Sequence, residues 1–95
     1  MFHYVYLLAR KEYLADGLNF YIGARSSKTS PDQDDYMGSG TLLPKSKVEK
    51  NQIFNKYILA ETNTRQEALN IERDLCNNEW VSNPSTFNIM LGGNN

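Results

Sequence analysis

The sequence predicts an α+β domain in which helices flank a small, mostly antiparallel, three-stranded sheet. Three observations lead to this fold. Two β-prone apolar runs, residues 2–9 and 18–24, lie a short turn apart. A third such run follows at residues 54–59, and a helical pattern with its own start signal covers residues 64–79. Because 95 residues can bury one modest core, we expect a single domain spanning residues 1–95.

The first two strands are expected to form an antiparallel hairpin. Residues 15–17, Ala-Asp-Gly, supply the turn. Side chains alternate between the faces of a strand, so Tyr4 and Tyr6 share one face of the first strand. By the same rule, Tyr21 and Arg25 share one face of the second, with a glycine between them. That glycine leaves room for another group to approach the backbone.

The middle of the chain combines a long loop with a basic segment. Residues 26–40 are polar and rich in turn residues, and a loop this long in a small domain is more often functional than incidental. Residues 41–52 predict a short helix with Pro44 in its first turn. The one basic cluster of the sequence lies here: Lys45, Lys47 and Lys50.

The C-terminal third predicts a capped helix followed by an extended segment. Thr64 and Glu67 match a capping box, which begins a helix over residues 65–79. Its buried side is expected to contain Ala68, Ile71, Leu75 and Cys76. Residues 83–85 end this region, and residues 86–91 predict a short strand or extended segment before a Gly-Gly pair.

Composition excludes several classes of protein. The formal net charge is −1, which argues against a tight stand-alone DNA binder but allows an enzyme that cuts DNA transiently or is delivered by another domain. One cysteine, Cys76, excludes an intramolecular disulfide and a multi-cysteine zinc site. The N-terminal apolar run ends at Ala9, too early for a signal peptide or a membrane span. We therefore expect a cytoplasmic protein without membrane contact.

Glu72 is the most informative single residue. It lies one helical turn after Ala68 and one turn before Cys76, at the edge of the apolar stripe. A carboxylate there either reaches solvent or a lysine, or it binds a hard divalent cation such as Mg²⁺. Such an ion needs few protein carboxylates, because it retains waters and binds substrate phosphates.

Other side chains with chemical potential also have structural alternatives. Tyr6 and Tyr21 either pack in the sheet or orient, or deprotonate, an attacking water. Arg25 either is a solvated surface cation or offsets charge on a phosphodiester transition state, where its planar fork binds two oxygens. Asn88 most simply serves a turn.

Several segments together resemble the GIY-YIG nuclease family. Tyr4-Val5-Tyr6 stands in place of Gly-Ile-Tyr, and Tyr21-Ile22-Gly23 matches the second half of the signature. Residues 36–40, Tyr-Met-Gly-Ser-Gly, resemble a segment of phage-encoded, Seg-type homing endonucleases of that family. Residues 67–72 and 87–93 resemble their C-terminal block, in which a Tyr/Phe-Asn pair precedes Gly-Gly.

The resemblance implies a DNA endonuclease that hydrolyses phosphodiester bonds with one divalent metal, Mg²⁺ or Mn²⁺, in a bacterial or phage-infected cell. It places Tyr6 and Tyr21 near the attacking water and the scissile phosphate. It makes Glu72 the metal ligand, and Asn88 the group that places phosphate or metal-bound water. Arg25 is the first candidate for the family's arginine.

Two departures from the family pattern leave alternatives open. Tyr4 stands where glycine is usual, and most members place the arginine farther beyond Tyr-Ile-Gly, so Lys28 or Lys45 could take its role. The rival hypothesis is a catalytically impaired module that binds nucleic acid or protein on the same fold. A third possibility is an interaction domain in which the tyrosines serve only for packing. DNA contacts are expected from Lys28, Lys45, Lys47 and Lys50. A separate targeting domain or partner, and a homodimer, are compatible with this chain.

Overall fold

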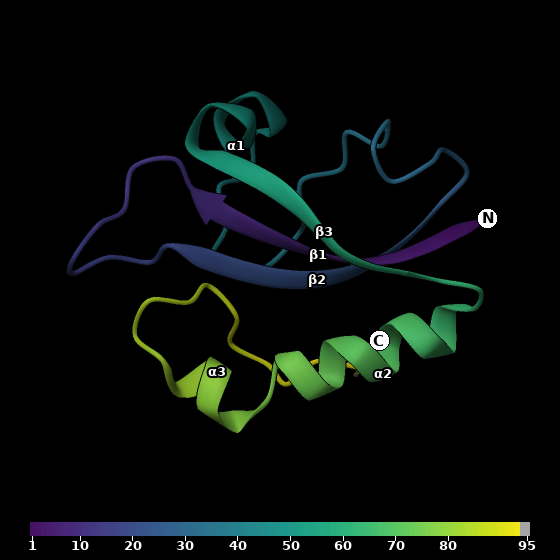
Figure 1. Ribbon diagram of the computed structural model, residues 1–95. Coiled ribbons are helices and arrows are strands. Elements are labelled where there is room, and N and C mark those ends of the chain that lie inside the picture. The colour runs from purple at the N-terminus through teal and green to yellow at the C-terminus, as the bar shows by residue number, and fades with distance from the viewer. Residues whose placement is uncertain (94–95) are drawn as a thin grey trace.

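A three-stranded antiparallel sheet with strand order β2-β1-β3 forms the centre of the molecule (Figure 1). The computed structural model describes residues 1–93. The elements are β1 (Phe2–Arg10), β2 (Phe20–Ser27), α1 (Lys47–Ile53), β3 (Phe54–Thr62), α2 (Arg65–Leu75) and α3 (Asn78–Ser82). The predicted hairpin, the third strand and the α+β class are thus confirmed.

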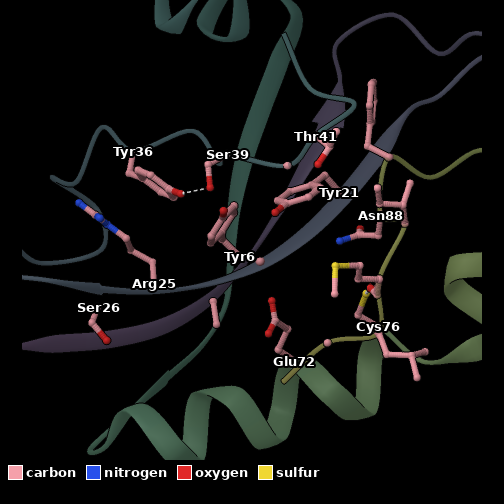
Figure 2. Close-up of a pocket in the computed structure, with 18 of the residues that line it drawn as sticks. Tyr6, Tyr21, Arg25, Ser26, Tyr36, Ser39, Thr41, Glu72, Cys76 and Asn88 are labelled. Atoms are coloured by element: carbon pink, nitrogen blue, oxygen red, sulfur yellow. Dashed lines mark hydrogen bonds between the residues drawn. The ribbon is translucent and has the colours of Figure 1, made fainter. Parts of the chain in front are cut away.

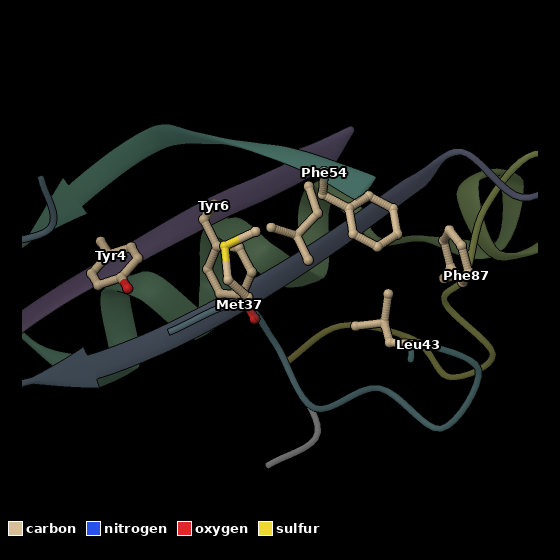
Figure 3. Close-up of a cluster of buried hydrophobic side chains, with 7 residues drawn as sticks. Tyr4, Tyr6, Met37, Leu43, Phe54 and Phe87 are labelled. Carbon is tan, nitrogen blue, oxygen red and sulfur yellow. The ribbon is translucent and has the colours of Figure 1, made fainter. Parts of the chain in front are cut away.

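The central strand β1 is buried on both faces. Tyr4, Tyr6 and Leu8 point into one cluster, together with Phe54 and Phe87 (Figure 3). The intervening Val5 joins a second cluster on the opposite face, where α2 and α3 cover the sheet (Figure 1). The alternation predicted for β1 is therefore present, and both faces carry core.

Helix α1 is shorter than predicted. It begins at Lys47 instead of residue 41, because the side chain of Ser46 accepts a hydrogen bond from the Glu49 amide and caps the helix there. Pro44 lies two residues before this cap and is not part of the helix. The following strand is longer than predicted, since β3 continues to Thr62.

The predicted helix over residues 65–79 is two helices. The capping box of Thr64 and Glu67 is present and begins α2. However, α2 ends at Leu75, and the Asn77 side chain accepts from the Trp80 amide to begin α3. Leu75 is consequently 41% exposed, although it was expected in the core.

The other positions of α2 show how the helix faces the sheet. Ala68 and Cys76, both expected to be buried, are buried. Ile71 is half-buried and packs against the cluster that contains Ala68 and Cys76, whereas Leu69 and Glu72 are buried. Of the described residues, 1–93, none belongs to a helix long and apolar enough to cross a membrane.

The C-terminal segment is extended, and it adds only one bridge to the sheet within the described residues. Thr86 forms an isolated parallel bridge with Phe20, and the Phe87 amide donates to the Phe20 carbonyl at 2.7 Å. Of the two alternatives for residues 86–91, the extended segment is confirmed and a further strand is wrong.

Gly23 provides the close approach that the sequence predicts. It pairs directly with Tyr6 on β1, and a Cβ at Gly23 would lie 2.4 Å from the Tyr6 hydroxyl oxygen. The approaching group is therefore a side chain of the neighbouring strand. Any larger residue at this position would displace the Tyr6 ring.

We expect Gly23→Ala to lower the free energy of unfolding by about 1–3 kcal/mol, because the buried Tyr6 ring has little room to move. Urea denaturation measures this loss. Ser82→Ala, at the exposed end of α3, is the control. Equal losses in both variants would contradict this account of the Tyr6–Gly23 contact.

Candidate active site

A cleft of 470 Å³ lies between β2, the loop after it, α2 and the C-terminal segment (Figure 2). Five residues predicted to be catalytic from the sequence line this cleft together: Tyr6, Tyr21, Arg25, Glu72 and Asn88. They come from two strands, one helix and the extended segment near residue 88. The fold thus brings the predicted site residues to one place.

Tyrosine rings form the floor of the cleft. The Tyr6 ring centroid lies 6.3 Å from that of Tyr21, 6.2 Å from that of Tyr36 and 5.9 Å from that of Tyr4. Tyr6 is fully buried, whereas Tyr21 is half-buried. This asymmetry makes the Tyr21 hydroxyl the more accessible of the two predicted site phenols.

Both predicted site phenols are uncharged near neutral pH. Burial, with a smaller contribution from the neighbouring tyrosines, raises the pKa of Tyr6 far above its ordinary value. Burial and then Tyr36 raise the pKa of Tyr21 to about 12. A neutral phenol can donate a hydrogen bond and orient a water, but it is a poor general base.

Glu72 extends from α2 into the cleft, although the residue is only 7% exposed. Its Oε1 accepts a hydrogen bond from the Gly93 amide at 2.8 Å. Figure 2 shows the carboxylate directed toward Tyr6 and Tyr21. Neither structural alternative, a solvent-facing carboxylate or one paired with a lysine, describes this position.

The close packing of residues 92–93 against α2 requires glycine at both positions. A Cβ on Gly92 would lie 2.5 Å from the Glu72 carbonyl oxygen, and Gly93 adopts a φ of +77°. Both positions therefore need glycine for the chain to turn tightly against α2. This tight turn places the Gly93 amide where it can donate to the Glu72 carboxylate.

The single carboxylate that lines the cleft suits a hard cation with few protein ligands. Within residues 1–93, no group of three or more His, Cys, Asp or Glu side chains could hold a metal ion by itself. Glu72 is the carboxylate among the residues that line the cleft. Mg²⁺ fits such a site, because it takes one or two carboxylates and completes its shell with water and phosphate oxygens.

Arg25 lies at the end of the cleft opposite Asn88 (Figure 2). Its Nε donates to Asp34 Oδ2 at 3.1 Å, and its guanidinium carbon lies 4.2 Å from the Tyr36 ring centroid. The Tyr36 hydroxyl in turn donates to Ser39 Oγ at 2.9 Å. Arg25 is thus held in one orientation by an ion pair and a cation–π contact.

Asp34 connects this cation to the core. The Tyr4 hydroxyl donates to Asp34 Oδ2 at 2.5 Å, and Lys56 Nζ donates to the Tyr4 oxygen at 2.8 Å. Burial opposes ionisation of Asp34, but the hydrogen bonds from Tyr4 and Arg25 outweigh it and lower the pKa of the carboxyl. Tyr4 therefore positions the partner of Arg25.

Asn88 has contacts of a different kind from those predicted. Its Oδ1 accepts from the Ile22 amide and from Trp80 Nε1, both at 2.9 Å, and its Nδ2 donates to the Ile22 carbonyl at 2.9 Å. The side chain therefore joins the C-terminal segment to β2 and α3. It does not serve a local turn, and most of its hydrogen-bonding capacity is used within the protein.

The predicted DNA-binding lysines lie outside the cleft. Lys28 and Lys45 are exposed, whereas Lys47 forms an ion pair with Asp35. Lys50 is buried, and its Nζ donates to the Gly38 carbonyl, so its ammonium group serves the loop. Lys47 and Lys50 line a smaller hollow of 220 Å³ that also contacts Arg25.

Three further candidate residues, Asp34, Lys56 and Arg65, could not be predicted from the sequence. Asp34 and Lys56 form the support of Arg25, and no local pattern joins residues so far apart in the sequence. Arg65 lines the cleft from the first turn of α2, where its Nη1 donates to Ser26 Oγ at 3.2 Å. A cation at the start of a helix suggests no site by itself, and only the packing of α2 on the sheet brings it here.

The chain is similar to three proteins of Enterobacteria phage T4. It is 31% identical to "Putative endonuclease segB" over 94 residues and 36% identical to "Putative endonuclease segD" over 95 residues, with 98% of this chain covered in each case. It is 40% identical to "Endonuclease segA" over 76 residues, or 77% of this chain. The predicted likeness to Seg-type phage proteins is confirmed.

These relatives are much longer than the present chain. The chain spans 40% of segB, 41% of segD and 33% of segA. No family model and no solved structure matches the chain.

We expect Asn88→Ala to lower the free energy of unfolding by about 1–3 kcal/mol, because the Ile22 amide and carbonyl lose their partner. The emission of Trp80, the one tryptophan of the sequence, should also shift, since its indole N–H loses an acceptor. Urea denaturation followed by tryptophan fluorescence measures both. Exposed Asn63→Ala is the control, and unchanged stability of Asn88→Ala would contradict the positioning role.

We expect Asp34→Asn to destabilise the protein at neutral pH but not in strong acid. The folded pKa of Asp34 lies below its unfolded value of about 3.9, so its stabilisation is complete above that value and disappears as pH falls through the folded pKa. Urea denaturation of both proteins at several pH values tests this. Asp35→Asn, at an exposed ion pair, should change little, and a pH-independent difference for Asp34→Asn would be evidence against the ion pair.

Proposed function

We propose that this chain is a divalent-metal-dependent DNA endonuclease domain of the GIY-YIG type. The observation that carries the proposal is the position of Glu72, whose carboxylate enters the same cleft as three tyrosines and two arginines. The similarity to phage proteins named as endonucleases supports it.

The proposed hydrolysis of a phosphodiester gives roles to Glu72 and to the two phenols. Glu72 would hold Mg²⁺ or Mn²⁺, which supplies Lewis-acid chemistry to the scissile phosphate and its leaving oxygen. The Tyr21 phenol orients the attacking water by a hydrogen bond, and the buried Tyr6 phenol fixes the Tyr21 ring. Because both phenols stay protonated, neither accepts the proton of the attacking water, and this proton leaves to solvent at the mouth of the cleft.

Cations at the edge of the cleft bind the phosphate. Arg25 is oriented by Asp34 and Tyr36, so little conformational entropy is lost when its guanidinium meets an anion. Arg65 provides a second cation on the α2 side of the cleft. In this assignment Asn88 positions the C-terminal wall, and exposed Lys28 and Lys45 add non-specific contacts to DNA.

One observation favours a second candidate, a binding module without catalysis. Arg25, the cation nearest to the second motif, already neutralises Asp34. A protein that uses Arg25 only to fix its loop would bind DNA or a partner protein through the cleft and would not cut. A nicking assay separates the two candidates.

We expect Glu72→Gln to abolish nicking of supercoiled plasmid in Mg²⁺, with a loss of at least about 100-fold, because glutamine cannot supply the charge that holds the cation. The fold should be retained, since a glutamine Oε1 can still accept from the Gly93 amide. The assay compares wild type and variant in Mg²⁺ and in EDTA.

Glu79→Gln, at an exposed position of α3, controls for a general change in charge. Nicking by wild type that persists in EDTA would refute metal dependence. Full activity of Glu72→Gln would refute the ligand assignment, and an inactive wild type that still binds DNA would favour the second candidate.

A further inference from the structure

The wall of the cleft formed by residues 89–91 is apolar and exposed. Ile89, Met90 and Leu91 are 53%, 66% and 43% exposed, and all three line the cleft. Scattered apolar residues on a surface need no explanation, but three in succession at the mouth of a polar cleft do. The proposed function gives no role to this triplet, which we term the apolar ridge.

The ridge is attached firmly at both ends. Before it, the Asn88 side chain is bonded to the backbone of Ile22 on β2. After it, the Gly92 amide donates to the Cys76 carbonyl at 2.8 Å, and Cys76 Sγ lies 3.5 Å from the Met90 carbonyl. The backbone is thus fixed to the sheet and to α2, while Ile89 and Met90 are more than half exposed.

The opposite edge of the cleft is polar and positively charged. Arg25, Ser26 and Arg65 line that edge and present two guanidinium groups and a hydroxyl. Cations suit phosphates, whereas apolar side chains suit the flat faces and sugar edges of bases. A nucleotide bound with its phosphate toward the arginines would therefore turn its base or sugar toward the ridge.

We propose that the apolar ridge contacts the base step at the scissile phosphate and unstacks it, so that the site acts best on DNA that is already weakly stacked. Proteins that insert Ile, Leu or Met side chains between bases distort duplex DNA in this way. The inference rests on the proposed function, because it assumes DNA in the cleft. Ile89 and Met90 are the residues that make the contact.

The test uses the double variant Ile89→Thr/Met90→Thr of the whole chain. The wild-type nick is first mapped by primer extension on plasmid. Two synthetic duplexes then carry that site, one fully paired and one with a single mismatch at the scissile step. Single-turnover cleavage in Mg²⁺ is measured for wild type, for the double variant, and for Tyr57→Thr, a matched control on β3 that is 51% exposed and does not line the cleft.

The double variant should cleave the paired duplex about tenfold more slowly than wild type, because unstacking loses its apolar support. The mismatched duplex should restore its rate to within about threefold of wild type, since a mismatched base costs less to unstack. Tyr57→Thr should match wild type on both duplexes.

An unchanged rate in the double variant would overturn the role of the ridge. An equal loss on both duplexes would overturn it as well, and would assign residues 89–91 to packing against further protein. These outcomes differ from failure of the proposed function, in which wild type itself nicks no plasmid. Thermal unfolding of each variant verifies that a slow rate is not a loss of fold.

Discussion

The fold and the candidate site both depend on the contact between Tyr6 on β1 and Gly23 on β2. The tyrosine ring lies over the glycine backbone, where any Cβ would overlap it. This contact lets a large phenol cross from the core to the floor of the cleft. Tyr6 packs there with Tyr4, Tyr21 and Tyr36, so the hydrophobic core and the site share one set of rings. Substitutions here should therefore affect stability and function together.

Around this centre, polar side chains fix the parts of the cleft relative to one another. Asn88 joins the C-terminal segment to β2, the Gly93 amide holds Glu72, and Asp34 holds Arg25. Each of these hydrogen bonds joins residues that belong to different segments of the chain. Preorganisation of this kind reduces the reorganisation needed when a charged substrate binds. Asn88, to which the family resemblance gives a catalytic role, is thus one of the supports of the cleft.

Much of the fold could be predicted because its signals are local. The β-prone runs, the alternation around Tyr6 and the capping box of Thr64 and Glu67 all act over a few residues. The errors also have local causes that the pattern hides. Ser46 and Asn77 cap helices at places where the hydrophobic period alone continues, which shortens α1 and divides the predicted long helix. A capping residue and a continuing hydrophobic period predict different helix ends, and the spacing of residues in the sequence does not show which of the two the protein adopts.

For the candidate site, the sequence by itself determined which residue types are present and in what order: two strand tyrosines, a following arginine, a helical glutamate and a late asparagine. Only the tertiary structure decided what surrounds each of them. It paired Arg25 with Asp34, buried Lys50, brought Arg65 to the cleft and left Ile89 and Met90 exposed at its edge. The reason is physical, because burial and ion pairing depend on neighbours in space, and in a 95-residue chain those neighbours come from segments that no short motif spans.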